Sequence, residues 1–426
     1  MIKINSNKKQ YIPLAILLLT LSVFYFWKYD QITNFIQGDG SSYYQYLIDI
    51  FITHDFSAVN KYPIGTALLQ MPFFLIAHLI TMITSPKMCD GYSFFYNAAV
   101  YISAVFYNLL GCTFIYNIIV KRYNWISAIF TVLSVSFGTM LLYYSTYDCS
   151  YSHVYSFAVC SASLNYVIYY DKNILNKNTS TRKKIFTSLI LGFLAGLIIL
   201  IRNTNAIFLL VYFLYDVTNF KTLKLRFKKI FNFKILIYQI LGILIAFLPQ
   251  SIYWKMQSGH FIINSYSNEE FYYWNNPKVT YVLFSDAKGL FIFCPILLIS
   301  MICLLIFRRE LKEFRTMIWT VFILNTYIIS SWWAWWMGFG YSCRLFCDIL
   351  CLFALPLGAL FGKIFSPQKL NITGILIAVC KTGILAIAIA AVIINLIWID
   401  GINNNAISMN FSSWQELTDW LNYIFK

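Results

Sequence analysis

Long apolar runs separated by short polar segments dominate the chain. The clearest runs are residues 11–27, 94–120, 123–143 and 235–253. Each can cross a bilayer as an α-helix, which needs about 20 apolar residues. A membrane offers backbone amides no water to bond with, so such runs must be helical. They also lack the alternation of polar and apolar positions that a β-barrel requires. The pattern therefore predicts an all-α, polytopic membrane protein.

We expect about eleven spans in one membrane domain over residues 1–400, followed by an outer tail at residues 401–426. The predicted spans are residues 11–27, 94–120, 123–143, 153–170, 185–201, 204–220, 235–253, 289–307, 316–332, 345–362 and 371–399. The predicted outer loops are residues 28–93, 144–152, 254–288 and 333–344. No cleavage site follows the first run, so we expect an uncleaved anchor rather than a signal peptide.

The net charge of +15 reflects where Lys and Arg lie relative to these spans. With the N-terminus inside, 22 of the 32 Lys and Arg residues fall inside and 9 outside, whereas 13 of the 17 acids fall outside. This distribution follows the positive-inside rule. The basic balance therefore indicates topology and contact with anionic inner-leaflet lipid, and it argues against a nucleic-acid partner.

Residues 63–84 are also long and apolar enough to span. If they crossed the membrane, every later loop would change sides and the charge bias would reverse. We therefore expect this segment to lie along the outer interface or to re-enter it. A second interfacial helix is expected before it, because Gln45, Asp49 and Thr53 recur at helical spacing.

Two features of the ten cysteines bear on function. Cys343, Cys347 and Cys351 repeat every four residues and so share a helix face, where small packing residues are favoured over metal ligands. Cys89 and Cys149 both fall outside, and whether they pair stays open.

The polar residues able to do chemistry gather on the predicted outer side, which holds all four histidines. There the stretch GDGSSYY, residues 38–44, places Asp39 between two glycines. Asp39 is either a helix cap or turn residue, or the base of an enzyme, and the local sequence leaves both readings open. Asp148 and His153 are five residues apart. They either belong to a solvated loop, or they position a donor substrate or hold a divalent metal.

Cations and aromatic rings accompany these acids. Lys288, Arg202 and Arg344 each stand at the outer end of a predicted span. Each either anchors the helix at the interface or binds a lipid phosphate, which suits the planar fork of arginine. Rings that could stack on a sugar are Tyr43, Tyr44, Trp332, Trp333, Trp335 and Trp336. If the substrate is a sugar linked to a lipid phosphate, the departing phosphate needs no acid to protonate it. One carboxylate then suffices as the base, whereas glycoside hydrolysis needs two carboxyl groups.

The order of these motifs resembles that of the GT-C glycosyltransferases. They are GDGSSYY, YPIGTALLQMPFF, Asp148, SDAKGLFIFCPILL and WWAWWMGFGYSCRLFCDILCLFALPL. The resemblance covers about residues 1–362. It implies about eleven spans, interfacial helices in the first outer loop, and a catalytic acid there, which falls on Asp39. Many members carry an acidic pair at this place, whereas Gly40 follows Asp39 here, so the need for a metal stays open.

The resemblance implies an inverting glycosyltransferase at the periplasmic face of a bacterial inner membrane. Such enzymes move a sugar from a polyprenyl-phosphate donor to a lipid-linked glycan or another cell-envelope acceptor. The Asn- and Lys-rich character further resembles O-antigen-modifying glucosyltransferases, which act on lipopolysaccharide precursors. The alternative is a transporter or flippase of a lipid-linked sugar. A transporter should carry ionisable residues at mid-membrane and inverted repeats. Lys381 is the one candidate, and no repeat is evident.

Overall fold

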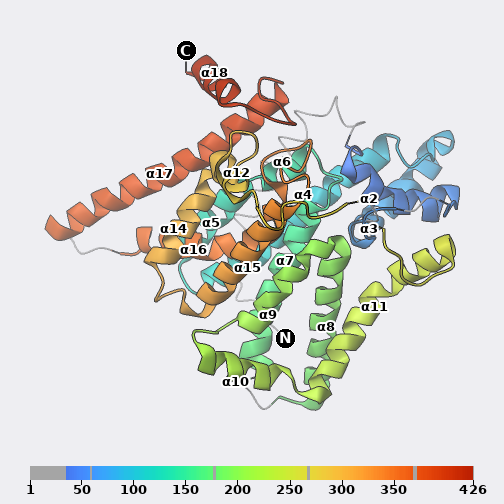
Figure 1. Ribbon diagram of the computed structural model, residues 1–426, viewed down its shortest axis with the longest axis horizontal. Coiled ribbons are helices and arrows are strands. Elements are labelled where there is room, and N and C mark those ends of the chain that lie inside the picture. Colours follow the sequence, from blue (N-terminus) through green and yellow to red (C-terminus); the bar gives the residue numbers. More distant parts are fainter. Residues whose placement is uncertain (1–34, 58–59, 176–178, 266–268, 368–371, 426) are drawn as a thin grey trace.

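A computed structural model describes residues 35–425, apart from residues 58–59, 176–178, 266–268 and 368–371. Over these ranges the chain is helical and contains no strand (Figure 1). This confirms the predicted all-α class. The predicted span at residues 11–27 lies outside the described residues.

The first half of the described chain runs from α2 to α9. Its elements are α2 (Asp39–Ile48), the π-helix η3 (Asp49–Thr53), α3 (Gly65–Thr84), η4 (Pro86–Met88), α4 (Phe94–Val120), α5 (Trp125–Phe137), α6 (Leu141–Thr146), α7 (His153–Tyr170), η5 (Asp171–Leu175), α8 (Thr181–Ile201), the 3₁₀-helix η6 (Asn203–Leu209) and α9 (Leu210–Leu214).

The second half runs from α10 to α18. Its elements are α10 (Phe220–Ile230), α11 (Phe233–Ser258), α12 (Val279–Phe284), α13 (Leu290–Phe293), α14 (Pro295–Ile306), α15 (Lys312–Ser331), the 3₁₀-helix η7 (Arg344–Ile349), α16 (Leu350–Ile364), α17 (Ile372–Asn403) and α18 (Trp414–Ile424).

By length and composition, six of the described helical segments could cross a membrane. They are Gly65–Thr84, Phe94–Val120, Thr181–Ile201, Ile235–Ser258, Arg344–Ile364 and Ile375–Asn403. The first is the segment predicted to be interfacial, and the other five coincide with predicted spans. These helices support a membrane-embedded protein, while the count of eleven spans stays a prediction.

Three predicted spans are divided rather than continuous. Residues 123–143 form α5 and α6, and residues 204–220 form the short η6 and α9, which ends at Leu214. Residues 289–307 break at Pro295, which begins α14 and has no backbone N–H to continue the preceding helix. Broken helices are tolerated in a membrane where protein covers their backbone. The six residues of α6 are indeed all buried.

Close helix packing builds the interior. α8 and α11 run side by side (Figure 1). A Cβ atom on Gly192 of α8 would lie 1.9 Å from the carbonyl oxygen of Gln239 in α11, so only glycine permits this approach. α17 projects along one edge, and its exposed side chains, such as Ile375, Leu376 and Ile387, are apolar, as expected of a lipid-facing surface.

α3 packs along α4 and against the end of α8. Gly65, at its start, meets the backbone of Leu200 in the last turn of α8. Further along, the backbone oxygen of Leu69 accepts a hydrogen bond from Tyr107 at 3.1 Å, and His78 Nδ1 lies 2.6 Å from the Tyr96 hydroxyl. Both tyrosines belong to the N-terminal half of α4. The contacts thus reach from the start of α4 to its middle, and the interfacial position expected for residues 63–84 stays a prediction.

The four predicted outer loops meet at one end of the helix bundle, where α7 and η7 begin and α8 and α15 end. We call this the site end. Residues more than 100 positions apart in the sequence touch there, including Gln37 with Asp148 and Asp39 with Arg344. The cysteines add no covalent link, since all ten, including Cys89 and Cys149, are free thiols.

Candidate active site

A pocket of about 490 Å³ lies at the site end. Three predicted outer loops, at residues 28–93, 254–288 and 333–344, line it together with residues 202–204 and residues at the end of α15. The charged residues that line it are Asp39, Lys61, Arg202, Glu269 and Arg344. Its apolar and aromatic wall includes Tyr62, Phe271, Ile328, Trp332 and Trp333. The pocket thus joins carboxylates, cations and ring faces in one space.

The two glycines of GDG position Asp39 for different reasons: Gly38 allows a backbone conformation, and Gly40 allows a close contact. Gly38 is the N-cap residue of α2 and has a φ of 55°, which favours glycine. Asp39 is the first residue of α2, and no side-chain bond caps this helix. A Cβ atom on Gly40 would lie 1.8 Å from the Ser150 hydroxyl oxygen, so α2 can approach that loop only because Gly40 lacks a side chain. The cap interpretation of Asp39 is therefore wrong.

Asp39 instead pairs directly with Arg344 in the pocket lining. Its Oδ2 accepts a hydrogen bond of 2.6 Å from Arg344 Nη2, and about a third of the Asp39 side chain remains exposed. A short contact between a carboxylate and a guanidinium is among the stronger hydrogen bonds in proteins. Asp39 is thus anchored by a cation while keeping an accessible face.

Gly40→Ala should displace Asp39 and destabilise the protein, because the new methyl group would collide with Ser150. Such overpacking typically costs about 1–3 kcal/mol. The double variant Gly40→Ala/Ser150→Gly should recover most of the loss, since it removes the colliding Ser150 atoms. The measurement compares thermal unfolding of the wild type and both variants. Gly383→Ala is the matched control, because nothing lies within 4 Å of a Cβ atom there. Failure of the Ser150→Gly rescue would contradict this packing argument.

Arg344 is held from three sides. It begins η7, and its Nη1 donates to the carbonyl oxygen of Phe339 at 3.1 Å. Its guanidinium lies 5.1 Å from the ring centre of Tyr151, a cation–π distance. With Asp39 on the third side, the planar fork is fixed at the pocket wall and can bind an anion bidentately.

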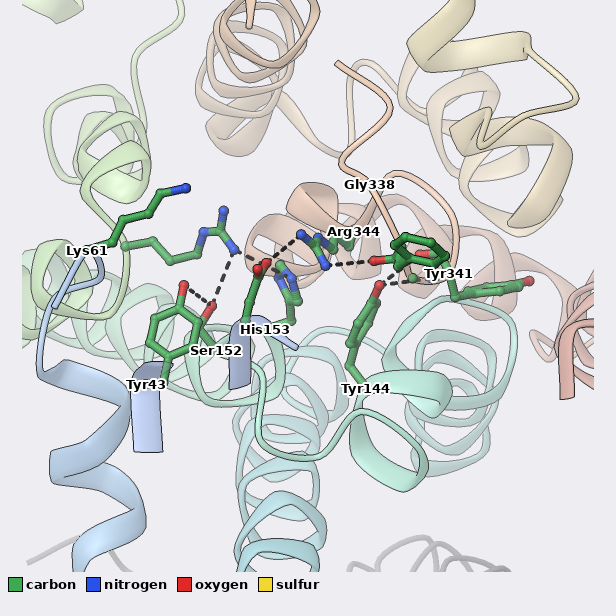
Figure 2. A network of polar contacts seen from close by, with 12 residues as sticks. Tyr43, Lys61, Tyr144, Ser152, His153, Gly338, Tyr341 and Arg344 are labelled. Carbon is green, nitrogen blue, oxygen red and sulfur yellow. Dashed lines mark hydrogen bonds and ion pairs between the residues drawn. The ribbon is translucent and has the colours of Figure 1, made fainter. Parts of the chain in front are cut away.

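Arg202 reaches the pocket from the end of α8, where its backbone is extended. Its Nη1 donates to the Ser152 hydroxyl at 3.3 Å and lies 3.5 Å from His153 Nε2. Ser152 in turn donates to the Tyr43 hydroxyl at 3.1 Å. Figure 2 shows this polar row extending from Tyr43 through Ser152 and His153 toward Arg344. The predicted cations Arg202 and Arg344 therefore reach the same pocket.

Lys288 has a different role from the one predicted. It is buried and absent from the pocket lining, and its Nζ donates to the carbonyl oxygens of Gly338 and, at 2.7 Å, Gly340. These carbonyls belong to a loop in which Met337 and Ser342 adopt positive φ values of 62° and 51°. Lys288 thus supports the strained loop that leads into Arg344, so its assignment as a phosphate ligand lacks support.

Lys288 should make stability depend on pH. Burial, and to a lesser degree the positive charge of Arg344, lowers the pKa of Lys288 to about 7. An unfolded lysine titrates near 10.4, so between these values the unfolded chain binds more protons and the folded state gains stability as pH rises. Below about pH 7 both states are protonated, and the full cost of the buried charge remains.

Thermal unfolding in detergent at pH 6.5, 8 and 9.5 provides the measurement. The wild type should gain stability relative to Lys288→Met as pH rises through this window, because methionine carries no proton. The exposed Lys87 gives the control variant Lys87→Met. A wild-type advantage over Lys288→Met that stays constant with pH would contradict the prediction.

The predicted aromatic residues divide into two groups. Trp332 and Trp333 line the pocket. Trp335 packs against Tyr281 and Trp336, outside the lining. The remaining residues, Tyr43 and Tyr44, are buried in α2: Tyr43 stacks on the pocket residue Tyr62 at 4.5 Å, and the Tyr44 hydroxyl donates to the Gly91 carbonyl at 2.8 Å. Of the six predicted aromatic residues, Trp332 and Trp333 are therefore the two that reach the pocket.

Asp148 and His153 do not form the predicted pair. Asp148 accepts a hydrogen bond from Gln37 at 3.2 Å, and burial raises its pKa. His153 lies beside Arg202 and Asp348 instead. In the part of the chain that the structure describes, no group of three or more His, Cys, Asp or Glu side chains is placed to hold a metal ion. Asp148 therefore supports the turn that leads into Asp39.

Three charged residues of this region escaped the sequence predictions. Lys61 and Glu269 form an ion pair at the pocket, although they are separated by 208 positions. Asp348 is buried beside Arg202. Asp348 did leave a signal, since an acid inside an apolar helix calls for a partner. Lys61 and Glu269 left none, because loop residues of opposite charge are common.

Comparison of the chain with protein-family models, curated proteins and solved structures yields no match.

Proposed function

We propose that the protein is a GT-C-type glycosyltransferase. It moves a sugar, with inversion, from a polyprenyl-phosphate donor to a lipid-linked glycan or another cell-envelope acceptor. The observation that carries the proposal is the contact between the carboxylate of Asp39 and the fork of Arg344 in a pocket with aromatic walls. It joins a base and a phosphate-binding cation at one point. The proposed setting is the periplasmic face of a bacterial inner membrane.

The reaction needs few protein groups. Asp39 accepts the proton of the acceptor hydroxyl, whose oxygen attacks the anomeric carbon of the donor sugar. The bond between that carbon and the phosphate oxygen breaks, and polyprenyl phosphate leaves with one additional negative charge. Arg344 and Arg202 stabilise this developing charge at the pocket wall. Proton and charge balance, since the proton gained by Asp39 matches the charge gained by the phosphate.

The remaining lining suits the rest of the substrate. Trp332 and Trp333 offer ring faces to the sugar, beside the polar groups of Lys61 and Glu269. Ile328 and Ile329, at the end of the apolar α15, line the same pocket. α15 also exposes Ile323 and Leu324 one to two turns earlier. A lipid chain attached to the phosphate thus has an apolar path out of the pocket.

A transfer assay tests this proposal. Purified protein in detergent is supplied with radiolabelled undecaprenyl-phosphate sugars and lipid-linked glycans, and the label is followed into the glycan. We expect transfer with inversion at the anomeric carbon. Protein that binds the donor yet transfers no sugar, and that moves the donor across vesicle membranes, would overturn the enzyme assignment in favour of a flippase.

The contacts of Lys381 weigh against the flippase. This lysine was the mid-membrane charge that a transporter would need. Its Nζ donates to the carbonyl and hydroxyl oxygens of Ser366, at 3.1 and 2.9 Å, two residues beyond the end of α16. A contact with a helix end suits an anchoring lysine better than a transport site.

A further inference from the structure

Two buried ionisable side chains beside the pocket, Asp348 and His153, have no role in the reaction described above. Asp348 and His153, which are 2% and 0% exposed, both approach Arg202. Asp348 Oδ2 lies 3.6 Å from Arg202 Nε, and His153 Nε2 lies 3.5 Å from Arg202 Nη1. Arg202 lines the pocket, whereas Asp348 and His153 do not. The two buried groups therefore contact the pocket cation without reaching the substrate space.

The two groups also face each other. Asp348 Oδ1 and His153 Nδ1 are 3.5 Å apart, and both atoms are buried without a hydrogen-bond partner. A neutral His153 with its proton on Nδ1 would direct that N–H at Asp348 and leave Nε2 to accept from Arg202. With the proton on Nδ1, the imidazole donates to Asp348 and accepts from Arg202. Both side chains then contact the guanidinium.

The helix that carries Asp348 links this cluster to the first cation. Asp348 follows Arg344 by four residues in η7, so one short helix presents Arg344 itself and the acid that holds Arg202. A buried carboxylate stays charged only beside a cation. Arg202 is the cation that pairs with Asp348.

We propose that Asp348, assisted by His153, is a positioning residue that orients Arg202 toward the donor phosphate. The inference rests on the proposed function. It adds that the donor phosphate is held by two arginines, of which Arg344 is fixed by Asp39 and Arg202 by Asp348. Asp348 acts through Arg202 and touches no substrate.

Donor kinetics of Asp348→Asn test this role, because the variant keeps the size of the side chain and removes its charge. We expect the donor KM to rise about tenfold and kcat to fall as well, because Arg202 loses the carboxylate that orients it and the displaced guanidinium both binds the phosphate and stabilises its developing charge. The matched control is Asp171→Asn, which breaks the buried Asp171–Arg226 pair at the other end of α7. This control should lower thermal stability and leave the donor KM unchanged. A similar shift of KM in both variants would show that Asp348 is merely structural.

A double-mutant cycle separates positioning from a general effect. Arg202→Gln should weaken donor binding, and adding Asp348→Asn should change it by no more than about twofold, because both changes act through one guanidinium. Additive losses would overturn the positioning role.

Binding of undecaprenyl phosphate distinguishes this inference from the proposed function. It can be followed by tryptophan fluorescence, since Trp332 and Trp333 line the pocket. If the wild type and Asp348→Asn bind this lipid equally tightly, the positioning role fails and the proposed function stands. If the wild type neither binds the lipid nor transfers sugar, the proposed function itself fails and the positioning role fails with it.

Discussion

Asp39→Asn is expected to lower kcat for sugar transfer by about 10²- to 10⁴-fold, the usual contribution of a general base. Asparagine has nearly the same shape but cannot accept the proton of the acceptor hydroxyl. The donor KM should change little, because the amide oxygen of asparagine can still accept the 2.6 Å hydrogen bond from Arg344 and keep the fork in place. Steady-state kinetics with purified variants measure both constants.

The pocket supplies its own control for this prediction. Glu269 also lines the pocket but pairs with Lys61, so Glu269→Gln removes a carboxylate of similar charge without touching Asp39. We expect Glu269→Gln to retain most of kcat. Transfer by Asp39→Asn at the wild-type rate would show that Asp39 serves only to hold Arg344.

Replacement of Arg344 should have the second largest effect. Arg344→Gln is expected to reduce kcat/KM for the sugar donor by about 10²- to 10³-fold. Other enzymes lose about this much when a hydrogen-bonding group that stabilises developing charge is removed. Arg344→Lys should recover only part of this loss. A lysine is a point charge and cannot hold Asp39, the Phe339 carbonyl and a phosphate with one planar fork. Donor binding and kcat are measured separately for both variants.

Arg226→Lys provides the comparison, because Arg226 is a buried arginine paired with Asp171 away from the site end. It should destabilise the protein while the surviving folded fraction transfers sugar normally. An Arg344→Lys variant with wild-type kcat/KM would contradict the bidentate role of the fork and would leave Arg344 as a simple source of positive charge.

Several features of the molecule could be read from residue order alone. The apolar runs determine a helical, membrane-type chain, because partition into lipid and helix formation depend mainly on local composition. The glycines on both sides of Asp39 signalled a special backbone. Grouping of the polar stretches on one side predicted that they would meet, and they do meet at the site end.

Which of these polar side chains enter the pocket depended on tertiary packing. Lys288 and Arg344 looked alike in the sequence, as cations at helix ends. The fold buries Lys288 against the Gly338 and Gly340 carbonyls and brings Arg344 to Asp39, 305 residues away. Arg202 and Asp348 are likewise distant in the sequence and are brought together only by the fold. Local sequence sets where a helix begins and ends, but the direction of a side chain across a pocket is set by how helices pack, and that depends on contacts between distant residues.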